Sequence, residues 1–381
     1  MTRQDVLVVG GGLIGLSIAW RAALAGRRVT VVDDRPGEGA SGVAAGMLAP
    51  VTEAAYGEQA LLALTVASAR RWPTFAADLE AAADTSVDHR QEPTLLVGHD
   101  RDDVTSIEEL AAFQRDLGLD VERLTARACR QVEPLLHPRV RGGVLARDDH
   151  RVDAQRVVSA LLTACAAAGV DVDRRRAVHL EHDGRRVEGV TLDDGTRLAS
   201  TTVVLAAGTW SADLAGIPDA ARPPVRPVKG QLLVLRADDP LALRPTVTVR
   251  ALVRGRPVYL VPREDGRLVV GATQEERGFD TTVTAGAVRQ LLDDAVEVLP
   301  VVDELTVEDV RAGLRPGTPD NRPLVGPTGL DGLLVATGHH RHGALLAPLT
   351  ADVVVAHLDG GDPGVDPAVL DPRRFAAEVI V

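Results

Sequence analysis

The sequence is poor in several residue types: it contains one lysine, Lys229, two cysteines and two methionines among 381 residues, and aromatic residues make up 2%. Arginine therefore carries nearly all of the positive charge, and the formal net charge is −12. A strongly negative protein is a poor partner for nucleic acid or for an anionic membrane surface. We therefore expect neither among its partners.

The two cysteines, Cys129 and Cys165, lie 36 residues apart without a CxxC pattern or metal-ligand spacing. We interpret them as free thiols in a reducing compartment. The apolar stretch 6–26 resembles a signal peptide, but it contains glycines and Arg21 and lacks a basic start and a cleavage site. No other run is long enough to span a bilayer, so we expect a cytoplasmic protein.

The length and the order of patterns predict an α/β chain with two domains. A strand at 4–9, a helix at 13–26 and a strand at 28–33 form a βαβ unit, typical of a Rossmann-like domain. Prolines cluster at 221–230, and 231–272 alternates strand and turn, which indicates a mostly antiparallel sheet. We assign 1–85, 150–225 and 310–381 to a nucleotide-binding domain, and 86–149 and 226–309 to a substrate domain. Further strands are expected at 92–98, 140–146, 200–209 and 332–338, a hairpin at 184–198, and helices at 58–83, 104–136 (two), 152–169, 284–298 and 343–358.

The glycine pattern Gly10-x-Gly12-x-x-Gly15 lies between the first strand and the first helix. The first glycine makes the turn, the second lets the backbone approach a pyrophosphate, and the third lets helix and strand pack closely. Asp33 ends the second strand and would accept hydrogen bonds from an adenosine ribose, which disfavours a 2′-phosphate and hence NADP. The alternative is a purely structural turn.

Two further stretches are candidates for contact with the same cofactor. The segment 40–50 is small and nearly uncharged, so a flat ring system could lie against its backbone, and Ser41 could donate to a phosphate; a surface loop is the alternative. Gly208 follows the buried strand at 200–209 and would lie against a dinucleotide, although any strand-to-turn junction has this pattern.

Two arginines lie beside glycines near the C-terminus and could hold a small anion. Arg315 is flanked by Leu314 and Pro316, which is unfavourable for a solvated surface, and its planar fork matches a carboxylate. Arg341 lies in the stretch 338–343, and the amides of the next helix would face a bound cofactor. The histidines of this stretch lack the spacing of a zinc site, so no metal is expected.

Tyr259 is one of only two tyrosines and lies in a predicted strand of the inserted sheet. The sequence around Tyr259 leaves two interpretations open. The tyrosine is packed within the sheet, or its phenol points into a substrate cavity.

Together these motifs resemble the FAD-dependent amine and amino-acid oxidases of the D-amino-acid oxidase type, and within them the thiamine-pathway glycine oxidases. The resemblance covers essentially the whole chain. Its motifs are Val-Val-Gly-Gly-Gly-Leu-Ile-Gly at 8–15, Ala-Ala-Gly-Met-Leu-Ala-Pro at 44–50, Val-Arg-Pro-Val-Lys-Gly-Gln at 225–231, Tyr-Leu-Val-Pro-Arg at 259–263, Gly-Ala-Thr at 271–273, Ala-Gly-Leu-Arg-Pro-Gly-Thr at 312–318 and Gly-His-His-Arg-His-Gly-Ala-Leu-Leu-Ala-Pro at 338–348.

The resemblance implies a role for each matching position. Arg315 and Tyr259 would bind the substrate carboxylate, Arg341 would lie at the flavin and the substrate entrance, and Met47 would lie beside the isoalloxazine ring. The other expected FAD contacts are Gly10, Gly12, Leu13, Ile14, Gly15, Asp33, Asp34, Ala40, Ser41, Ala45, Gly46, Val178, Gly208, Gly338, His339, His340, His342, Gly343, Ala344 and Leu345. The chain departs from the family where Asp33 replaces the usual glutamate, Gln274 a methionine and His342 an asparagine.

The activity implied by this resemblance is the oxidation of glycine or a related small amine by non-covalently bound FAD, with dioxygen as the second substrate. The alternative within this family is a sarcosine or D-amino-acid oxidase or dehydrogenase. Two alternatives of other classes are a non-catalytic FAD-binding subunit and an NAD-dependent reductase. The resemblance also implies a homo-oligomer and a place in thiamine biosynthesis.

Overall fold

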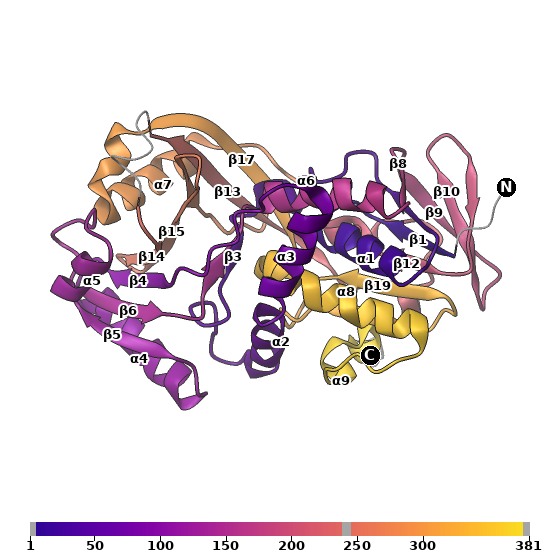
Figure 1. Cartoon of the computed structure of the whole chain (residues 1–381), viewed down its shortest axis with the longest axis horizontal. Coiled ribbons are helices and arrows are strands. Elements are labelled where there is room, and N and C mark those ends of the chain that lie inside the picture. The colour runs from indigo at the N-terminus through magenta and orange to yellow at the C-terminus, as the bar shows by residue number, and fades with distance from the viewer. Residues whose placement is uncertain (1–4, 238–244, 376–381) are drawn as a thin grey trace.

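The computed structural model describes residues 5–237 and 245–375, and a six-stranded sheet organises the half that contains both ends of the described chain (Figure 1). Its strand order is β18-β19-β12-β1-β2-β8, and every neighbouring pair is parallel except β18–β19. The strands are β1 (Val6–Val9), β2 (Val29–Val32), β8 (Asp171–Asp173), β12 (Val203–Leu205), β18 (Leu324–Pro327) and β19 (Leu333–Thr337).

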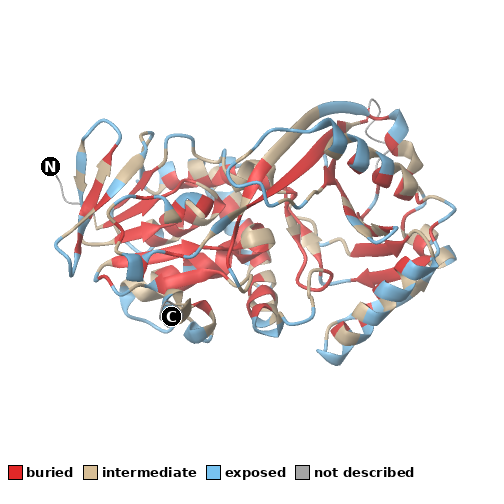
Figure 2. Cartoon of the chain, turned by 180° about the vertical axis from the view of Figure 1, so that it is seen from behind, coloured by how far each residue is buried: buried red, intermediate tan, exposed pale blue. Residues whose placement is uncertain are grey.

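Both faces of this sheet are covered, which explains why β1, β2 and β12 are buried along their whole length and consist of valine and leucine, apart from Thr30 in β2. Helices pack on one face and a three-stranded antiparallel sheet packs on the other. Figure 2 shows the resulting buried layer along the strands. The helices are α1 (Leu13–Leu24), α2 (Gln59–Ala69), α3 (Trp72–Ala83), α6 (Ala154–Ala167) and α8 (Gly343–Asp359), and the covering strands are β9 (Ala177–His182), β10 (Val187–Leu192) and β11 (Arg197–Ala199).

The other half is built on an eight-stranded sheet of order β17-β13-β16-β15-β14-β4-β6-β5, in which only β14–β4 is parallel. Helix α7 (Ala285–Val298) covers one face, and α4 (Arg101–Asp116) packs on the other face at the far end. The strands are β4 (Thr94–Gly98), β5 (Val121–Thr125), β6 (Gly142–Ala146), β13 (Arg226–Arg236), β14 (Thr248–Val253), β15 (Arg256–Pro262), β16 (Arg267–Gly271) and β17 (Thr306–Gly317).

The long antiparallel pair β13–β17 runs from the eight-stranded sheet toward the six-stranded one (Figure 1). Its register pairs Arg226 with Gly317 at one end and Arg236 with Thr306 at the other. The remaining short elements are β3 (Met47–Leu48), which pairs with β7 (His150–Arg151), and the helices α5 (Ala126–Val132) and α9 (Pro367–Leu370).

The predicted α/β architecture, with a Rossmann-like unit and a mostly antiparallel second sheet, is confirmed. The strands of the six-stranded sheet come from the three segments that we assigned to the nucleotide-binding domain. The domain limits themselves stay a prediction, and residues 1–4, 238–244 and 376–381 of the assigned ranges lie outside the described residues. Among the described residues, no helix combines the length and apolar character needed to cross a membrane.

Several local predictions were wrong. The helix expected over 58–83 is two helices, because Pro73 cannot donate a backbone hydrogen bond and fits only the first turn of α3. Strand β5 interrupts the helical region expected over 104–136: Gly118 adopts a φ of +81° after α4, and the chain then pairs with β6. The strands β8 and β18 escaped prediction because they are short and, in β8, flanked by aspartates.

Candidate active site

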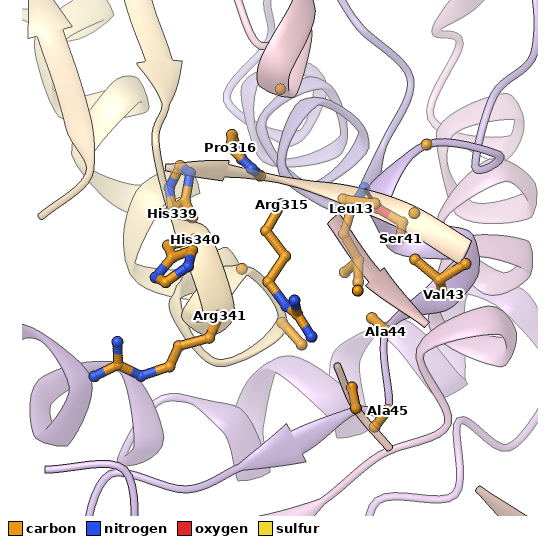
Figure 3. Close-up of a pocket in the computed structure, with 18 of the residues that line it drawn as sticks. Leu13, Ser41, Val43, Ala44, Ala45, Arg315, Pro316, His339, His340 and Arg341 are labelled. Carbon is orange, nitrogen blue, oxygen red and sulfur yellow. Dashed lines mark hydrogen bonds between the residues drawn. The ribbon is translucent and has the colours of Figure 1, made fainter. Parts of the chain in front are cut away.

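A cavity of about 1370 Å³ lies where segments far apart in the sequence meet (Figure 3). Its walls come from the β1–α1 turn, the segment 37–47, the ends of β2 and β12, the strands β13, β15 and β17, and the segment 336–344. Pockets for drug-sized ligands usually measure roughly 300–1,000 Å³. This cavity is therefore large enough for a dinucleotide together with a small second molecule.

The turn between β1 and α1 brings the backbone close to the cavity. Gly10 has a φ of +112°, and a Cβ there would lie 2.4 Å from the carbonyl oxygen of Ala206. Helix α1 has Gly12 as its N-cap, which has no side chain of its own to cap the helix, and no acidic residue lies in its first turn. The positive end of the helix therefore lines the cavity and favours an anion there.

Asp33 and Ser41 complete this end of the cavity. Asp33 accepts hydrogen bonds from the amides of Gly11 (2.5 Å) and Arg35 (2.8 Å), which fixes its carboxylate and leaves lone pairs for hydroxyl donors. The Ser41 hydroxyl accepts from the amide of Leu13 at 2.9 Å, so it caps α1 from a distant loop. Both residues line the cavity.

Arg315 lies near the end of the long strand β17. Its guanidinium lies over Gly230 of β13, where a Cβ would be 2.4 Å from Nη1. Nη1 donates to the carbonyl oxygen of Thr273 at 3.2 Å. In the described part of the chain, Arg315 has no carboxylate partner, and Figure 3 shows its side chain extending into the cavity.

Tyr259 lies on β15 of the same sheet, separated from the strand of Arg315 by β16 and β13, and its side chain reaches over β16 toward the guanidinium. Its hydroxyl lies over Gly271 of β16, where a Cβ would be only 2.3 Å away. Burial raises the pKa of the Tyr259 phenol and outweighs the opposing effect of Arg315, so the phenol stays protonated and can donate. The sequence analysis included Gly230 and Gly271 only as parts of motifs and assigned them no role of their own. A glycine inside a strand can indicate that another group lies close to the backbone there, and this signal was available.

Arg341 lines the same cavity but points away from Arg315 (Figure 3). Its guanidinium pairs with Glu53, at 2.7 Å, and with Glu58. Glu53 also binds Arg250 at 2.8 Å. Burial raises the pKa of Glu53, but Arg250, His342 and Arg341 together lower it to about 2.

This network separates the two arginines that we expected to act together. Arg341 is neutralised by carboxylates, whereas Arg315 is partly buried and unpaired among the described residues. The sequence analysis missed Glu53, Glu58 and Arg250, because single acidic residues in a loop carry no local signal of such a network.

The three histidines of this stretch have different environments. His339 is buried, and its Nε2 is 2.9 Å from the Thr350 hydroxyl. His340 lines the cavity with a φ of +48°, and its buried Nδ1 has no hydrogen-bond partner. Burial lowers the pKa to about 3 for His339 and His342 and to about 4 for His340. Over residues 5–237 and 245–375, no group of His, Cys, Asp and Glu is arranged to hold a metal.

Most of the predicted site residues line the cavity, and four do not. Gly15 packs α1 on β1, since a Cβ there would lie 1.9 Å from the Gly10 carbonyl oxygen. Gly338 has a φ of +77° and abuts Thr318. His342 is buried behind the cavity near Glu53, and Leu345 accepts hydrogen bonds from α2 and α3 with its carbonyl. The predicted residues that line the cavity are Gly10, Gly12, Leu13, Ile14, Asp33, Asp34, Ala40, Ser41, Ala45, Gly46, Met47, Val178, Gly208, Tyr259, Arg315, His339, His340, Arg341, Gly343 and Ala344.

The arrangement can hold a dinucleotide together with a small anion, and comparison with known proteins identifies the family. The model of the FAD dependent oxidoreductase family, DAO, matches residues 5–357. The chain belongs to this family.

Similar proteins were found among curated sequences and solved structures. A glycine oxidase of Pseudomonas putida is 35% identical, covering 97% of this chain and 98% of that protein. The bifunctional protein ThiO/ThiG of Synechocystis is 34% identical over 98% of this chain, which spans only about half (54%) of that relative's length. The crystal structure of glycine oxidase from Geobacillus kaustophilus superposes with a TM-score of 0.89 at 30% identity, covering 98% of this chain and 99% of that one.

FAD is the cofactor of this family, and the cavity fits it. The start of α1, whose first turn has no acidic residue, suits the pyrophosphate. Asp33 suits a ribose, and the small side chains of 44–46 leave room for a flat ring. Neither Cys129 nor Cys165 lines the cavity, and burial raises their pKa values to about 11 and about 12. Non-covalent binding is consistent with both observations.

Because of the buried histidines, we expect the free energy of unfolding to fall as the pH is lowered. Below about pH 6.5 the unfolded chain binds a proton that folded His339, with its pKa of about 3, does not bind. Each such histidine therefore lowers the free energy of unfolding by roughly 1.4 kcal/mol per pH unit. We expect His339→Gln to reduce this slope when urea unfolding is measured between about pH 6.5 and 5. Asp149, whose pKa burial raises to about 6, changes stability equally in both proteins; equal slopes would contradict the prediction.

Proposed function

We propose that this chain oxidises glycine to the corresponding imine with FAD and dioxygen, and serves the thiazole branch of thiamine biosynthesis. The observation that carries the proposal is Arg315: a partly buried guanidinium without a carboxylate partner among the described residues, directed into a cavity shared with the FAD site. A cation in this position needs an anion from outside the chain. The carboxylate of an amino acid supplies it.

The chain's own residues bind and orient the substrate. Arg315 offers two parallel N–H donors to the carboxylate, and the protonated Tyr259 offers a third. Bound FAD supplies the electron acceptor. The substrate loses two electrons and two protons to become an imine, dioxygen is reduced to hydrogen peroxide, and water then releases ammonia and the oxo acid. Orientation accounts for the protein's part, and no acid–base dyad is needed.

A second candidate is a sarcosine or D-amino-acid oxidase activity. The cavity continues past Tyr259 to an apolar wall formed by Leu96, Ile107 and Leu110, which exceeds what glycine requires. An N-methyl group or a small side chain would find room there. Gln274 also lines the cavity and would adjust the preference by its polarity.

The test is an absorbance spectrum of the purified yellow protein, recorded without air before and after the addition of glycine. We expect glycine to bleach the flavin band and air to restore it with formation of peroxide. Sarcosine, D-alanine and D-proline, tested in parallel, rank the substrates. Bleaching by sarcosine or a D-amino acid but not by glycine would support the second candidate, and bleaching that yields no peroxide in air would indicate a dehydrogenase.

Two further expectations belong to this proposal. We place the enzyme in the cytoplasm, and we expect a homo-oligomer because of its resemblance to glycine oxidases. Light scattering coupled to size-exclusion chromatography tests the second expectation directly, and a mass of about 40.2 kDa, that of one chain, would contradict it.

A further inference from the structure

The only lysine of the sequence is buried in strand β13, on the face opposite to the cavity. The side chain of Lys229 in β13 is 1% exposed, and its Nζ donates to Asp280 at 2.6 Å. The backbone of Lys229 also exchanges two hydrogen bonds of 2.9 Å with Glu275. A buried ammonium is costly unless it is paired, so this single lysine needs the segment that carries Asp280.

Lys229 does not face the cavity. Its neighbour Gly230 lies against the Arg315 guanidinium, and side chains alternate along a strand, so Lys229 and Gln231 point to the opposite face. On that face Gln231 binds both ends of the same segment. It donates to the Glu275 carboxylate at 2.7 Å and accepts from the amide of Thr284 at 2.8 Å. The backbone of Gln231 also binds Thr273, donating to its hydroxyl at 2.9 Å and accepting from its amide at 3.2 Å. The segment 272–284 is thus fastened to β13 at four points, through Thr273, Glu275, Asp280 and Thr284.

The same segment forms part of the cavity wall. Ala272, Thr273, Gln274 and Glu275 line the cavity, and the carbonyl oxygen of Thr273 accepts the hydrogen bond from Arg315. That is the hydrogen bond that orients the guanidinium in the described chain, since Arg315 has no ion pair there. The contacts that hold Thr273 in place therefore also determine the direction of the Arg315 guanidinium.

We propose that Lys229 is a positioning residue for substrate binding: through Asp280 it holds the segment 272–284 so that Thr273 keeps Arg315 aimed at the substrate carboxylate. The inference rests on the proposed function in that Arg315 binds a carboxylate, but it does not depend on which amino acid is oxidised. The ion pair lies outside the cavity, so its effect must pass through the segment.

The first test measures binding of acetate, a carboxylate without an amine, by its perturbation of the flavin spectrum in the FAD-loaded enzyme. We expect Lys229→Met and Asp280→Asn each to raise the dissociation constant of acetate and the KM for the oxidised amino acid about tenfold, within the usual range of coupling. The kcat and the FAD content should change less than about twofold. Lys229→Arg should restore most of the affinity. Because the Asp280 side chain is 37% exposed, water can solvate it in Lys229→Met. In Asp280→Asn the amide oxygen can still accept a hydrogen bond from the buried ammonium, so we expect both variants to fold.

A matched control lies on the same strand. Arg236 at the far end of β13 pairs with Glu308 of β17, and neither residue lines the cavity. Arg236→Met therefore removes one cation and one ion pair from β13, yet acetate binding should be unchanged. Equal weakening in Lys229→Met and Arg236→Met, or unchanged acetate binding in both Lys229→Met and Asp280→Asn, would overturn the proposal.

A second test uses the fact that the chain has one ε-amine. Among the amines of the chain, an acetylating reagent can modify only Lys229 and the N-terminal α-amine, and mass spectrometry separates the two products. Buried Lys229 reacts only when the segment opens, so saturating acetate should slow its modification several-fold and leave the α-amine rate unchanged. A rate at Lys229 that does not respond to acetate would overturn the proposal, whereas failure of glycine to bleach the flavin would overturn only the proposed substrate.

Discussion

Replacing Arg315 with alanine is expected to raise the KM for glycine by at least tenfold and to lower kcat/KM by a similar or larger factor. A charge-assisted, bidentate hydrogen bond contributes roughly 1.5–3 kcal/mol, which corresponds to a factor of about 10 to 150. Arg315→Lys keeps the charge but loses the planar fork, so it should fall between alanine and the wild type. Steady-state kinetics with peroxide detection measures both effects.

The control for this prediction is another arginine of the cavity wall. Arg35 lines the cofactor end, its side chain is 71% exposed, and its contacts with Asp34 and Glu38 are longer than 3.5 Å. Arg35→Ala makes the same change of charge and should leave the KM for glycine unaltered. Unchanged glycine kinetics in Arg315→Ala would refute the assigned role. Equal effects in both variants would mean that the loss of one positive charge, and not the position of Arg315, changes the kinetics.

Replacing Gly15 with alanine is expected to abolish FAD binding, or to weaken it by more than about a hundredfold. The new Cβ would lie 1.9 Å from the carbonyl oxygen of Gly10, which is backbone and cannot rotate away. Helix α1 must then move away from β1, and the amides at its start leave the position that suits a pyrophosphate. The ratio of flavin to protein absorbance and the fluorescence of released flavin measure the outcome.

Gly286→Ala is the matched control, because Gly286 lies in helix α7 and a Cβ there meets nothing within 4 Å. This variant should bind FAD normally and gain roughly 0.4–1 kcal/mol of stability, since alanine loses less backbone entropy than glycine on folding. If Gly15→Ala fails to fold, urea unfolding of the protein freed of FAD shows it. A yellow Gly15→Ala protein with wild-type stability would contradict the packing argument.

The strands and helices that the sequence predicted correctly share a local cause. The glycine turn and the valine-rich strands β1, β2 and β12 have patterns set within a few residues, by backbone freedom or by burial on both faces. The short strand β5 was missed because its strand character depends on pairing with β6, which no local pattern records.

The same distinction applies to the candidate site. Residue type predicted Arg315 as a carboxylate ligand and Asp33 as a ribose ligand, because a planar cation and a strand-end acid have few other uses in such contexts. Residue type alone also led us to expect that Arg341 and Arg315 both hold a small anion. Only the fold brings Glu53 and Glu58 to Arg341, across about 280 residues of sequence, whereas Arg315 has no carboxylate partner in the described part of the chain.

The sequence by itself determined the nucleotide-binding unit and the class of cofactor, and it predicted a carboxylate ligand in Arg315, because these follow from glycine geometry, strand burial and the shape of a guanidinium. The tertiary structure decided which charges neutralise one another, which strand glycines make room for Arg315 and Tyr259, and which segment contacts Lys229. The positions of the strand glycines depend on the register of β13, β16 and β17. Register arises from contacts between distant segments, so it can be observed only after the chain has folded.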